Sequence, residues 1–141
     1  EVIAAFRQQI NTKNIKLFPD INHDLFVMCE KQKILFVLQE IIENPIKYTK
    51  DGGSISMYLG SEGQYVHLNV ADNGIGLSQE EIPRLFSKFY RTSSAQKADT
   101  EGMGVGLYIL KDIVSRHGGT ISVHSDGLGK GSTFSLLLKR A

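Results

Sequence analysis

The sequence predicts an α+β fold, a two-layer α/β sandwich in which helices cover one face of a mixed, mostly antiparallel sheet. Two patterns carry this prediction. Apolar residues recur at helical spacing over residues 31–49 and 106–117, which gives each segment one apolar stripe for packing. Over residues 55–70 and 121–138 apolar and polar residues alternate instead. Strands of that kind bury one face only, so helices must cover it.

The N-terminal part of the chain is expected to form two helices and two extended segments. Residues 2–11 place apolar side chains at helical spacing and predict a short amphipathic helix. Residues 15–18 and 25–28 are candidates for extended structure, and the turn-forming residues of 19–22 separate them. The long helix over residues 31–49 follows.

The C-terminal part is expected to form two hairpins, with a helix and a long loop between them. The first hairpin covers residues 55–70, and glycines link the two strands of the second, at 121–138. The helix over 106–117 should end at Gly118. Residues 72–106 contain a polar stretch that is long for a compact domain, and such loops usually serve as lids or binding loops.

Length and charge narrow the function. The chain has 141 residues, which suits one compact domain, and its 16 basic and 15 acidic residues give a net charge of +1. This balance gives no support to nucleic-acid binding or to attraction by an anionic membrane. The sequence has no apolar stretch long enough to span a bilayer. The single cysteine, Cys29, lies in an apolar run and is expected to be a small buried core residue.

One side of the long helix carries polar residues that could bind a nucleotide. Glu40, Asn44 and Lys47 are spaced i, i+4 and i+7, so they project together, away from the apolar stripe. They offer a carboxylate, an amide oxygen that can ligate Mg²⁺ and a cation for phosphate. A solvated helix face explains the same pattern, and the three residues alone do not decide between the two interpretations.

Two glycine-containing segments flank the polar loop. Asp72 ends a predicted strand, and Gly74 and Gly76 allow the backbone after it to turn sharply and approach a flat ligand. An ordinary Asx turn accounts for this segment equally well. The glycines of residues 102–106 open a helix, where backbone N–H groups form a site suited to phosphate. A lone glycine run is weak evidence, and neither the dinucleotide fingerprint nor the Walker pattern occurs in the sequence.

The order of these segments is more specific than any one of them. It resembles the ATP site of the superfamily that includes gyrase-type topoisomerases, heat-shock chaperones, mismatch-repair ATPases and histidine kinases, whose fold is the Bergerat fold. The details resemble the catalytic, ATP-binding domain of sensor histidine kinases. The segments similar to its N box, first glycine box, F box and second glycine box are, in turn, residues 43–49, 70–76, 86–91 and 102–107. Residues 117–121 and 129–134 resemble its C-terminal part as well.

The resemblance implies a role for each matched residue. Asp72 would accept a hydrogen bond from the adenine amino group, with Thr133 supporting Asp72 through water. Asn44 would bind the Mg²⁺ that bridges the phosphates, and Arg91, in the lid, would reach the γ-phosphate. Glu40 and Arg91 are the catalytic candidates, and Asn44 is the metal ligand. The nucleotide-binding residues that the resemblance implies are Asn44, Lys47, Tyr48, Asp72, Gly74, Gly76, Tyr90, Arg91, Gly102, Gly104, Gly106, Leu107 and Thr133.

Three residues depart from the histidine kinase pattern. One is Met103, which replaces a common threonine where the backbone is expected to do the binding. Glu40 stands where most histidine kinases have a second asparagine. A glutamate there resembles the superfamily's ATPases and the anti-sigma-factor serine kinases, in which it acts as a general base. Pro45 replaces the usual alanine, and inside a helix it removes one backbone hydrogen bond, so we expect a kink that could displace Asn44. A serine kinase of the anti-sigma-factor type and a degenerate, non-catalytic interaction domain are therefore the alternatives.

The resemblance implies that the domain binds Mg-ATP and donates the γ-phosphoryl group to a histidine in two-component signal transduction. His23, His67, His117 and His124 all lack the sequence context of that phosphoacceptor. Residues 1–141 are therefore expected to be a catalytic domain without its dimerisation and phosphoacceptor segment, and not to autophosphorylate alone. The expected partners are that segment of the parent protein and a downstream response regulator, without nucleic acid or membrane contact by this domain. The expected location is the cytoplasm.

Overall fold

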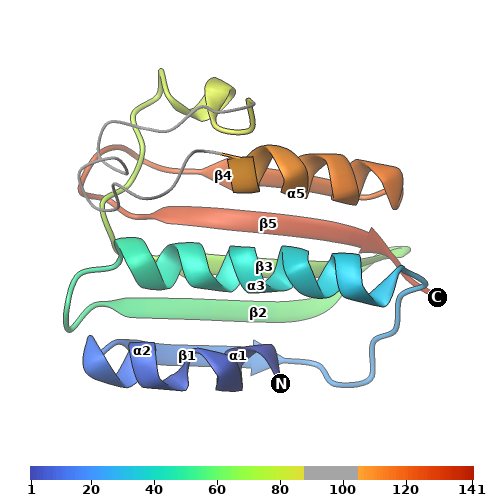
Figure 1. The fold of residues 1–141 in the computed structure, drawn as a ribbon, viewed down its shortest axis with the longest axis horizontal. Helices are drawn as coiled ribbons and strands as arrows, with labels where there is room; N and C mark the ends of the chain where they lie inside the picture. The colour runs from blue at the N-terminus through green and yellow to red at the C-terminus, as the bar shows by residue number, and fades with distance from the viewer. Residues whose placement is uncertain (88–104) are drawn as a thin grey trace.

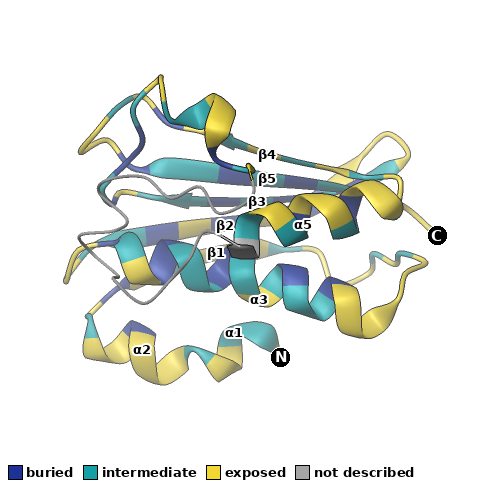
Figure 2. Ribbon diagram, turned by 45° about the horizontal axis from the view of Figure 1, so that its top comes forward, coloured by how far each residue is buried: buried dark blue, intermediate teal, exposed yellow. Residues whose placement is uncertain are grey.

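The computed structural model describes residues 1–87 and 105–141, and of Val105 and Gly106 only the backbone. Helices cover one face of a sheet, and the other face is open (Figures 1 and 2). The helices are α1 (Val2–Ala5), α2 (Arg7–Thr12), α3 (Lys31–Tyr48) and α5 (Val105–Arg116), with a 3-10 turn, η1 (Ile82–Arg84). The strands are β1 (Lys16–Ile21), β2 (Ser54–Glu62), β3 (Tyr65–Asp72), β4 (Thr120–His124) and β5 (Ser132–Lys139). The two-layer α+β prediction is confirmed.

The described part of the chain forms a five-stranded mixed sheet in the order β1-β2-β3-β5-β4. Both predicted hairpins are present, as β2 with β3 and β4 with β5. The central pairing of β3 with β5 is antiparallel and joins the two hairpins, while β1 is added parallel to β2 at the edge. In the β3–β5 register Asp72 lies opposite Ser132, which brings the end of one hairpin to the start of the other.

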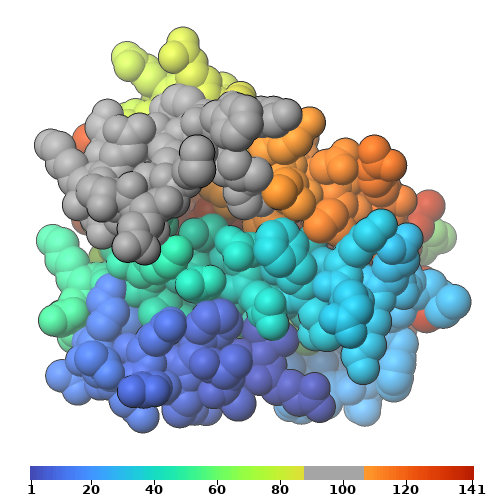
Figure 3. Space-filling model, viewed as in Figure 1, coloured from blue at the N-terminus to red at the C-terminus, as the bar shows by residue number. Residues whose placement is uncertain are grey.

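The core lies between the helices and the inner face of the sheet. Helix α3 crosses the sheet between the N-terminal helices and α5 (Figures 1 and 3), and the helices turn their buried sides toward the strands (Figure 2). Apolar side chains that are at most 2% exposed come from α3, α5 and the three central strands; they are Val37, Ile41, Ile46, Ile55, Val70, Leu110, Val114 and Leu136. Burying each of them stabilises the fold by about 1.5–3 kcal/mol.

Two N-terminal expectations change. The helix predicted over residues 2–11 is divided at Phe6, whose φ of −107° and ψ of 8° interrupt it. The turn predicted at residues 19–22 begins only at Asn22, whose Oδ1 accepts the N–H of Asp24 at 2.9 Å, because β1 continues through Pro19 to Ile21. Pro19 cannot donate a backbone hydrogen bond, and an edge strand tolerates this because one of its sides has no neighbouring strand.

The second extended segment, predicted at residues 25–28, is not a strand of the sheet. Only Val27 forms a bridge, with Arg140, because a strand needs a hydrogen-bonded partner and not apolar residues alone. Phe26 is 72% exposed and Met28 84% exposed. Cys29 is exposed as well, so its predicted burial is also wrong.

Helix α5 ends as predicted at Gly118, whose N–H donates to the carbonyl of Ser115 at 3.0 Å. His117, the residue after α5, makes two hydrogen bonds. Its Nδ1 lies 2.8 Å from the carbonyl of Ile113, and the backbone N–H of Glu30 donates to its Nε2 at 3.2 Å. With Nε2 as the acceptor, Nδ1 is the ring nitrogen that donates to the Ile113 carbonyl. His117 thus ties the end of α5 to the start of α3.

Helix α3 does not break at Pro45. It continues as one element to Tyr48 (Figure 1), with Pro45 fully buried in its last turns. The missing N–H of Pro45 deprives only the carbonyl of Ile41 of its helical partner. The sequence around Asn44 therefore remains helical.

The end of α3 is closed by residues from distant parts of the chain. The last four carbonyls of a helix have no partner within it. Lys13, which follows α2, extends its ammonium group across two of them. The donors and distances are Thr49 N–H to Pro45 at 2.9 Å, Lys13 Nζ to Ile46 at 2.7 Å and to Lys47 at 3.0 Å, and Ile75 N–H to Tyr48 at 3.2 Å.

None of the described helices combines the length and the apolarity that a membrane span requires.

Replacement of Lys13 by methionine should destabilise the fold. The substitution keeps much of the aliphatic chain and removes the charged donor from two carbonyls, so the free energy of unfolding should fall by about 1–2 kcal/mol. Denaturant unfolding measures this, with Lys16→Met as the control at an exposed lysine of β1. Equal stability of the Lys13→Met variant and the wild type would contradict the capping role.

Candidate functional site

Three elements end close together at one end of the molecule (Figure 1). They are the C-terminal end of α3, the C-terminal end of β3 and the start of β5. Asp72 is the last residue of β3 and Ser132 the first of β5, and the two are register partners. The carbonyl of Tyr48, at the end of α3, accepts the N–H of Ile75. Asp72, predicted from the sequence, is the centre of this arrangement.

The carboxylate of Asp72 is half-buried and held by three donors. Its Oδ1 accepts the N–H of Gly74 at 2.8 Å and the N–H of Ser132 at 3.3 Å, and its Oδ2 accepts the Ser132 hydroxyl at 3.1 Å. Burial raises the pKa of the Asp72 carboxyl above its ordinary value, and these hydrogen bonds offset part of that rise. A carboxylate can accept about four hydrogen bonds, so this one has capacity for a ligand donor.

The hydroxyl beside Asp72 belongs to Ser132 and not to Thr133. In the β3–β5 register Thr133 lies opposite Ala71. Successive side chains of a strand point to opposite faces, so Thr133 is directed away from the face that Ser132 and Asp72 share. Sequence reasoning missed Ser132. The register of β5 against β3 was the information needed to choose between the two neighbours.

The glycines after Asp72 are required by close backbone packing. We call residues 73–77 the β3 loop and residues 125–131 the β4–β5 turn. A Cβ on Gly74 would lie 2.2 Å from the carbonyl oxygen of Tyr48, and one on Gly76 would lie 2.1 Å from that of Gly127. Real Cβ contacts are not that short. Both glycines are buried, and the packing of the loop requires that they lack a Cβ.

The polar face of α3 is partly covered. Glu40 and Asn44 are half-buried, whereas Lys47 is exposed. Burial, and secondarily the negative charge of Glu43, raises the pKa of the Glu40 carboxyl, and Lys47 counteracts this rise. The ammonium of Lys47 lies 3.8 Å from the carboxylate of Glu43. Glu40 and Asn44 therefore lie on a partly buried face of α3 and not on a fully solvated one.

The structure describes only some of the remaining predicted site residues. Tyr48 is half-buried at the end of α3, and Leu107 is half-buried and packs on the core. Gly106 lies in the first turn of α5, of which only the backbone is described there. The predictions for Tyr90, Arg91, Gly102 and Gly104 concern residues outside the described ones.

The donor atoms of this site suit a nucleotide with Mg²⁺. In the described ranges no three His, Cys, Asp or Glu side chains gather as a metal-binding group. Mg²⁺ that bridges phosphates keeps phosphate and water ligands and needs only one or two protein oxygens. Asn44 and Glu40 project from the same face of α3 and can supply them. Asp72, nearer the loops, offers an acceptor for a base with an amino group.

Known proteins are similar to this chain in sequence and in fold. Residues 29–141 match the family model described as "Histidine kinase-, DNA gyrase B-, and HSP90-like ATPase". The chain is 37% identical over 128 residues to the sensor histidine kinase WalK of Bacillus subtilis, which covers 89% of this chain and 21% of WalK. The chain therefore spans about a fifth of the length of that relative.

Solved structures agree with this match. The catalytic domain of histidine kinase ThkA, in a nucleotide-free form, has a TM-score of 0.85 at 26% identity, covering 99% of this chain and 89% of that domain. The structure of ThkA in complex with the response regulator protein TrrA has a TM-score of 0.81 at 25% identity, covering 99% of this chain and 38% of the ThkA chain.

Replacement of Asp72 by asparagine should not destabilise the fold at neutral pH. Because burial raises the pKa of Asp72 in the folded state, the folded protein holds this proton more tightly than the unfolded chain does. Its ionisation, as the pH rises from about 4 through the raised pKa, therefore lowers the free energy of unfolding. The asparagine side chain would keep an oxygen for the Gly74 N–H and would not ionise. The variant should gain stability relative to the wild type as the pH rises toward about 7.

Denaturant unfolding at several pH values measures this difference. The two proteins should be closest in stability at the acid end, where Asp72 is protonated. A wild type whose free energy of unfolding rises relative to that of the variant as the pH rises would contradict the raised pKa of Asp72.

Proposed function

The chain belongs to the family of histidine kinase-, DNA gyrase B- and HSP90-like ATPases, and we propose that it is the ATP-binding catalytic domain of a sensor histidine kinase. In this proposal it binds Mg-ATP and donates the γ-phosphoryl group to a histidine on a dimerisation and phosphoacceptor segment of the parent protein. The match to WalK and to the catalytic domain of ThkA supports the histidine kinase branch.

The observation that carries this proposal is the fixed carboxylate of Asp72. An adenine presents an amino group as donor beside ring nitrogens, whereas guanine presents a carbonyl oxygen at the corresponding position. A half-buried carboxylate, already oriented by Gly74 and Ser132, can accept a hydrogen bond from the adenine amino group and would repel the guanine carbonyl oxygen. We therefore assign Asp72 the selection of ATP over GTP.

The helix α3 supplies the phosphate end of the site. Asn44 ligates Mg²⁺ through its amide oxygen, and bound Mg²⁺ neutralises phosphate charge. Lys47 meets the phosphates, and Tyr48 lies beside the nucleoside. Phosphoryl transfer depends mainly on positioning and on neutralising charge, and a continuous helix through Pro45 presents Asn44 and Lys47 from one rigid element. Thr133, Gly74 and Gly76 contribute through the backbone around Asp72.

We assign the lid roles by the same resemblance. Arg91 reaches the γ-phosphate and Tyr90 contacts the nucleotide, while the glycines of 102–106 offer backbone N–H groups to phosphate oxygens. Leu107 borders the same site. These assignments rest on the motifs of the sequence, since most of these residues lie outside the described ranges.

A second candidate is a serine kinase of the anti-sigma-factor type. Glu40 favours it, because a half-buried carboxyl whose pKa is raised by burial and by Glu43 is a better proton acceptor than an exposed one. In that case Glu40 would activate the hydroxyl of a protein serine. The match with sensor kinases along most of the chain favours the first candidate.

The proposed partners follow from the histidine kinase assignment. The parent protein's own phosphoacceptor segment receives the phosphoryl group, and a response regulator takes it in turn. ThkA, which shares this fold, has been solved in complex with the response regulator protein TrrA. We propose that the domain works in the cytoplasm.

The isolated domain should bind a non-hydrolysable ATP analogue, and Asp72→Asn should weaken this binding by roughly 30- to 100-fold. The asparagine can place its NH₂ against the adenine amino group, which leaves two donors facing each other and costs about 2–3 kcal/mol. Calorimetric titration with and without Mg²⁺ measures both effects, and Asn44→Ala should abolish the Mg²⁺ dependence.

The matched control is Asp20→Asn, the same chemical change at an exposed residue of the edge strand β1, which should leave the affinity unchanged. Absence of binding by the wild-type domain would overturn the proposal and favour a non-catalytic interaction domain.

The stability of the phosphorylated product in acid separates the two kinase candidates. The domain should phosphorylate a two-helix phosphoacceptor segment of a sensor kinase, added in trans with Mg-ATP, on an acid-labile histidine. Radiolabelled product is counted before and after acid treatment. Label that survives acid and maps to a serine would favour the serine kinase instead.

A further inference from the structure

We infer that the buried hydroxyl of Ser125 is a positioning group for the nucleotide, because it holds together the two backbone segments that orient Asp72. This inference rests on the proposed nucleotide binding and adds a residue that touches neither the base nor the phosphates. Ser125 follows β4 and is 2% exposed. Such a buried hydroxyl needs partners, and the partners here come from both sides of the site.

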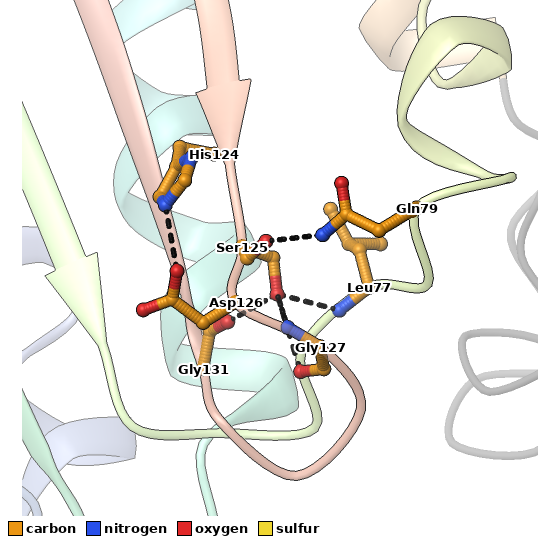
Figure 4. A network of polar contacts seen from close by, with 7 residues as sticks. All are labelled: Leu77, Gln79, His124, Ser125, Asp126, Gly127 and Gly131. Carbon is orange, nitrogen blue, oxygen red and sulfur yellow. Dashed lines mark hydrogen bonds and ion pairs between the residues drawn. The ribbon is translucent and has the colours of Figure 1, made fainter.

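Ser125 uses one hydroxyl to join the β3 loop to the β4–β5 turn (Figure 4). Its Oγ accepts the backbone N–H of Leu77 at 2.9 Å and donates to the carbonyl of Gly131 at 2.7 Å. The N–H of Gly127 lies 3.3 Å from the same oxygen. The side-chain amide of Gln79 adds a hydrogen bond to the Ser125 carbonyl at 2.9 Å. The Ser125 hydroxyl therefore adds a buried side-chain link between the two segments, beside the backbone hydrogen bonds that join them.

One of the groups that Ser125 holds, Gly131, is a chain neighbour of a donor residue to Asp72. Gly131 precedes Ser132, whose hydroxyl and N–H bind the carboxylate. The N–H of Gly131 also donates to the carbonyl of Gly74 at 3.1 Å, and the N–H of Gly74 is the third donor to Asp72. A displacement at Gly131 would therefore move all three of these donors.

The β3 loop and the β4–β5 turn are packed too closely to slide past each other when the Ser125 hydroxyl is lost. A Cβ on Gly131 would lie 2.0 Å from the carbonyl oxygen of Asp72, and one on Gly76 would lie 2.1 Å from that of Gly127. The N–H of Gly129 donates to the carbonyl of Ile75 at 2.7 Å. Removal of the Ser125 hydroxyl leaves the N–H of Leu77 and the carbonyl of Gly131 without their partner, and buried groups of that kind drive the backbone to rearrange. The loops can then separate only by moving the backbone around Asp72.

The expected consequence is a defect in base recognition. In Ser125→Ala the Kd for ADP should rise roughly ten-fold, the equivalent of one buried polar group losing its partner. Adenosine should lose the same factor, because the defect lies at the base end of the site and not at the phosphates. The preference for ADP over GDP should fall. Calorimetric titration of the domain with ADP, adenosine and GDP measures these quantities at a temperature at which every variant is folded.

Two further variants separate positioning from stability. Ser135→Ala removes a serine hydroxyl of β5 that is hydrogen-bonded to Asn69 on the opposite face of the sheet, and it should leave the Kd for ADP unchanged. Ser125→Cys keeps a weaker donor and acceptor of similar size and should restore much of the affinity. It also keeps the test usable where the alanine variant does not fold.

The outcomes are distinct. A Ser125→Ala domain with a lowered melting temperature and unchanged affinity and base preference would overturn the positioning role. Unchanged affinity in both Ser125 variants would do the same. A wild-type domain that binds no nucleotide would overturn the proposed function and this inference with it.

Discussion

The arrangement at the end of β3 depends on direct backbone-to-backbone contact. Two segments distant in sequence, the β3 loop and the β4–β5 turn, approach so closely that Gly76 and Gly131 have no room for a Cβ. This contact sets where β5 begins relative to Asp72, and so it places Ser132 opposite the carboxylate. The contact depends on the close fit of the two backbones and not on one strong bond, since backbone carbonyls here form the packing surface that side chains usually form.

The same end of the molecule holds the last turn of α3, and the N-terminal segment secures it. Lys13 donates to two terminal carbonyls of the helix, and Ile75 from the β3 loop donates to a third. The β3 loop thus contacts both α3 and the β4–β5 turn. A shift of α3 along its axis would strain these hydrogen bonds. They therefore hold the helix face that carries Asn44 at a fixed position relative to Asp72.

The site carries a cost in stability. Burial disfavours the ionised forms of Asp72 and Glu40, and raises the pKa of each carboxyl. A protein selected for stability alone would have little reason to keep two half-buried carboxyls. The apolar core, centred on Ile41, Val70 and Leu136, offsets the cost. Perturbed carboxyls of this kind cluster at functional sites, in keeping with nucleotide binding.

The sequence by itself determined which main segments form helices and which form strands, and also the order of the motifs. It also pointed to Asp72, Asn44 and Glu40 as candidate site residues. Those conclusions depend on local spacing, because side-chain direction along a helix or strand follows from residue number. The tertiary structure decided every feature that involves contact between distant parts of the chain. The parallel addition of β1, the exposure of Phe26 and Met28, and the capping by Lys13 all involve chain segments that no local pattern connects. Ser132 was chosen over Thr133 only by the register of β5 against β3, since a shift of one residue reverses which side chain faces the site.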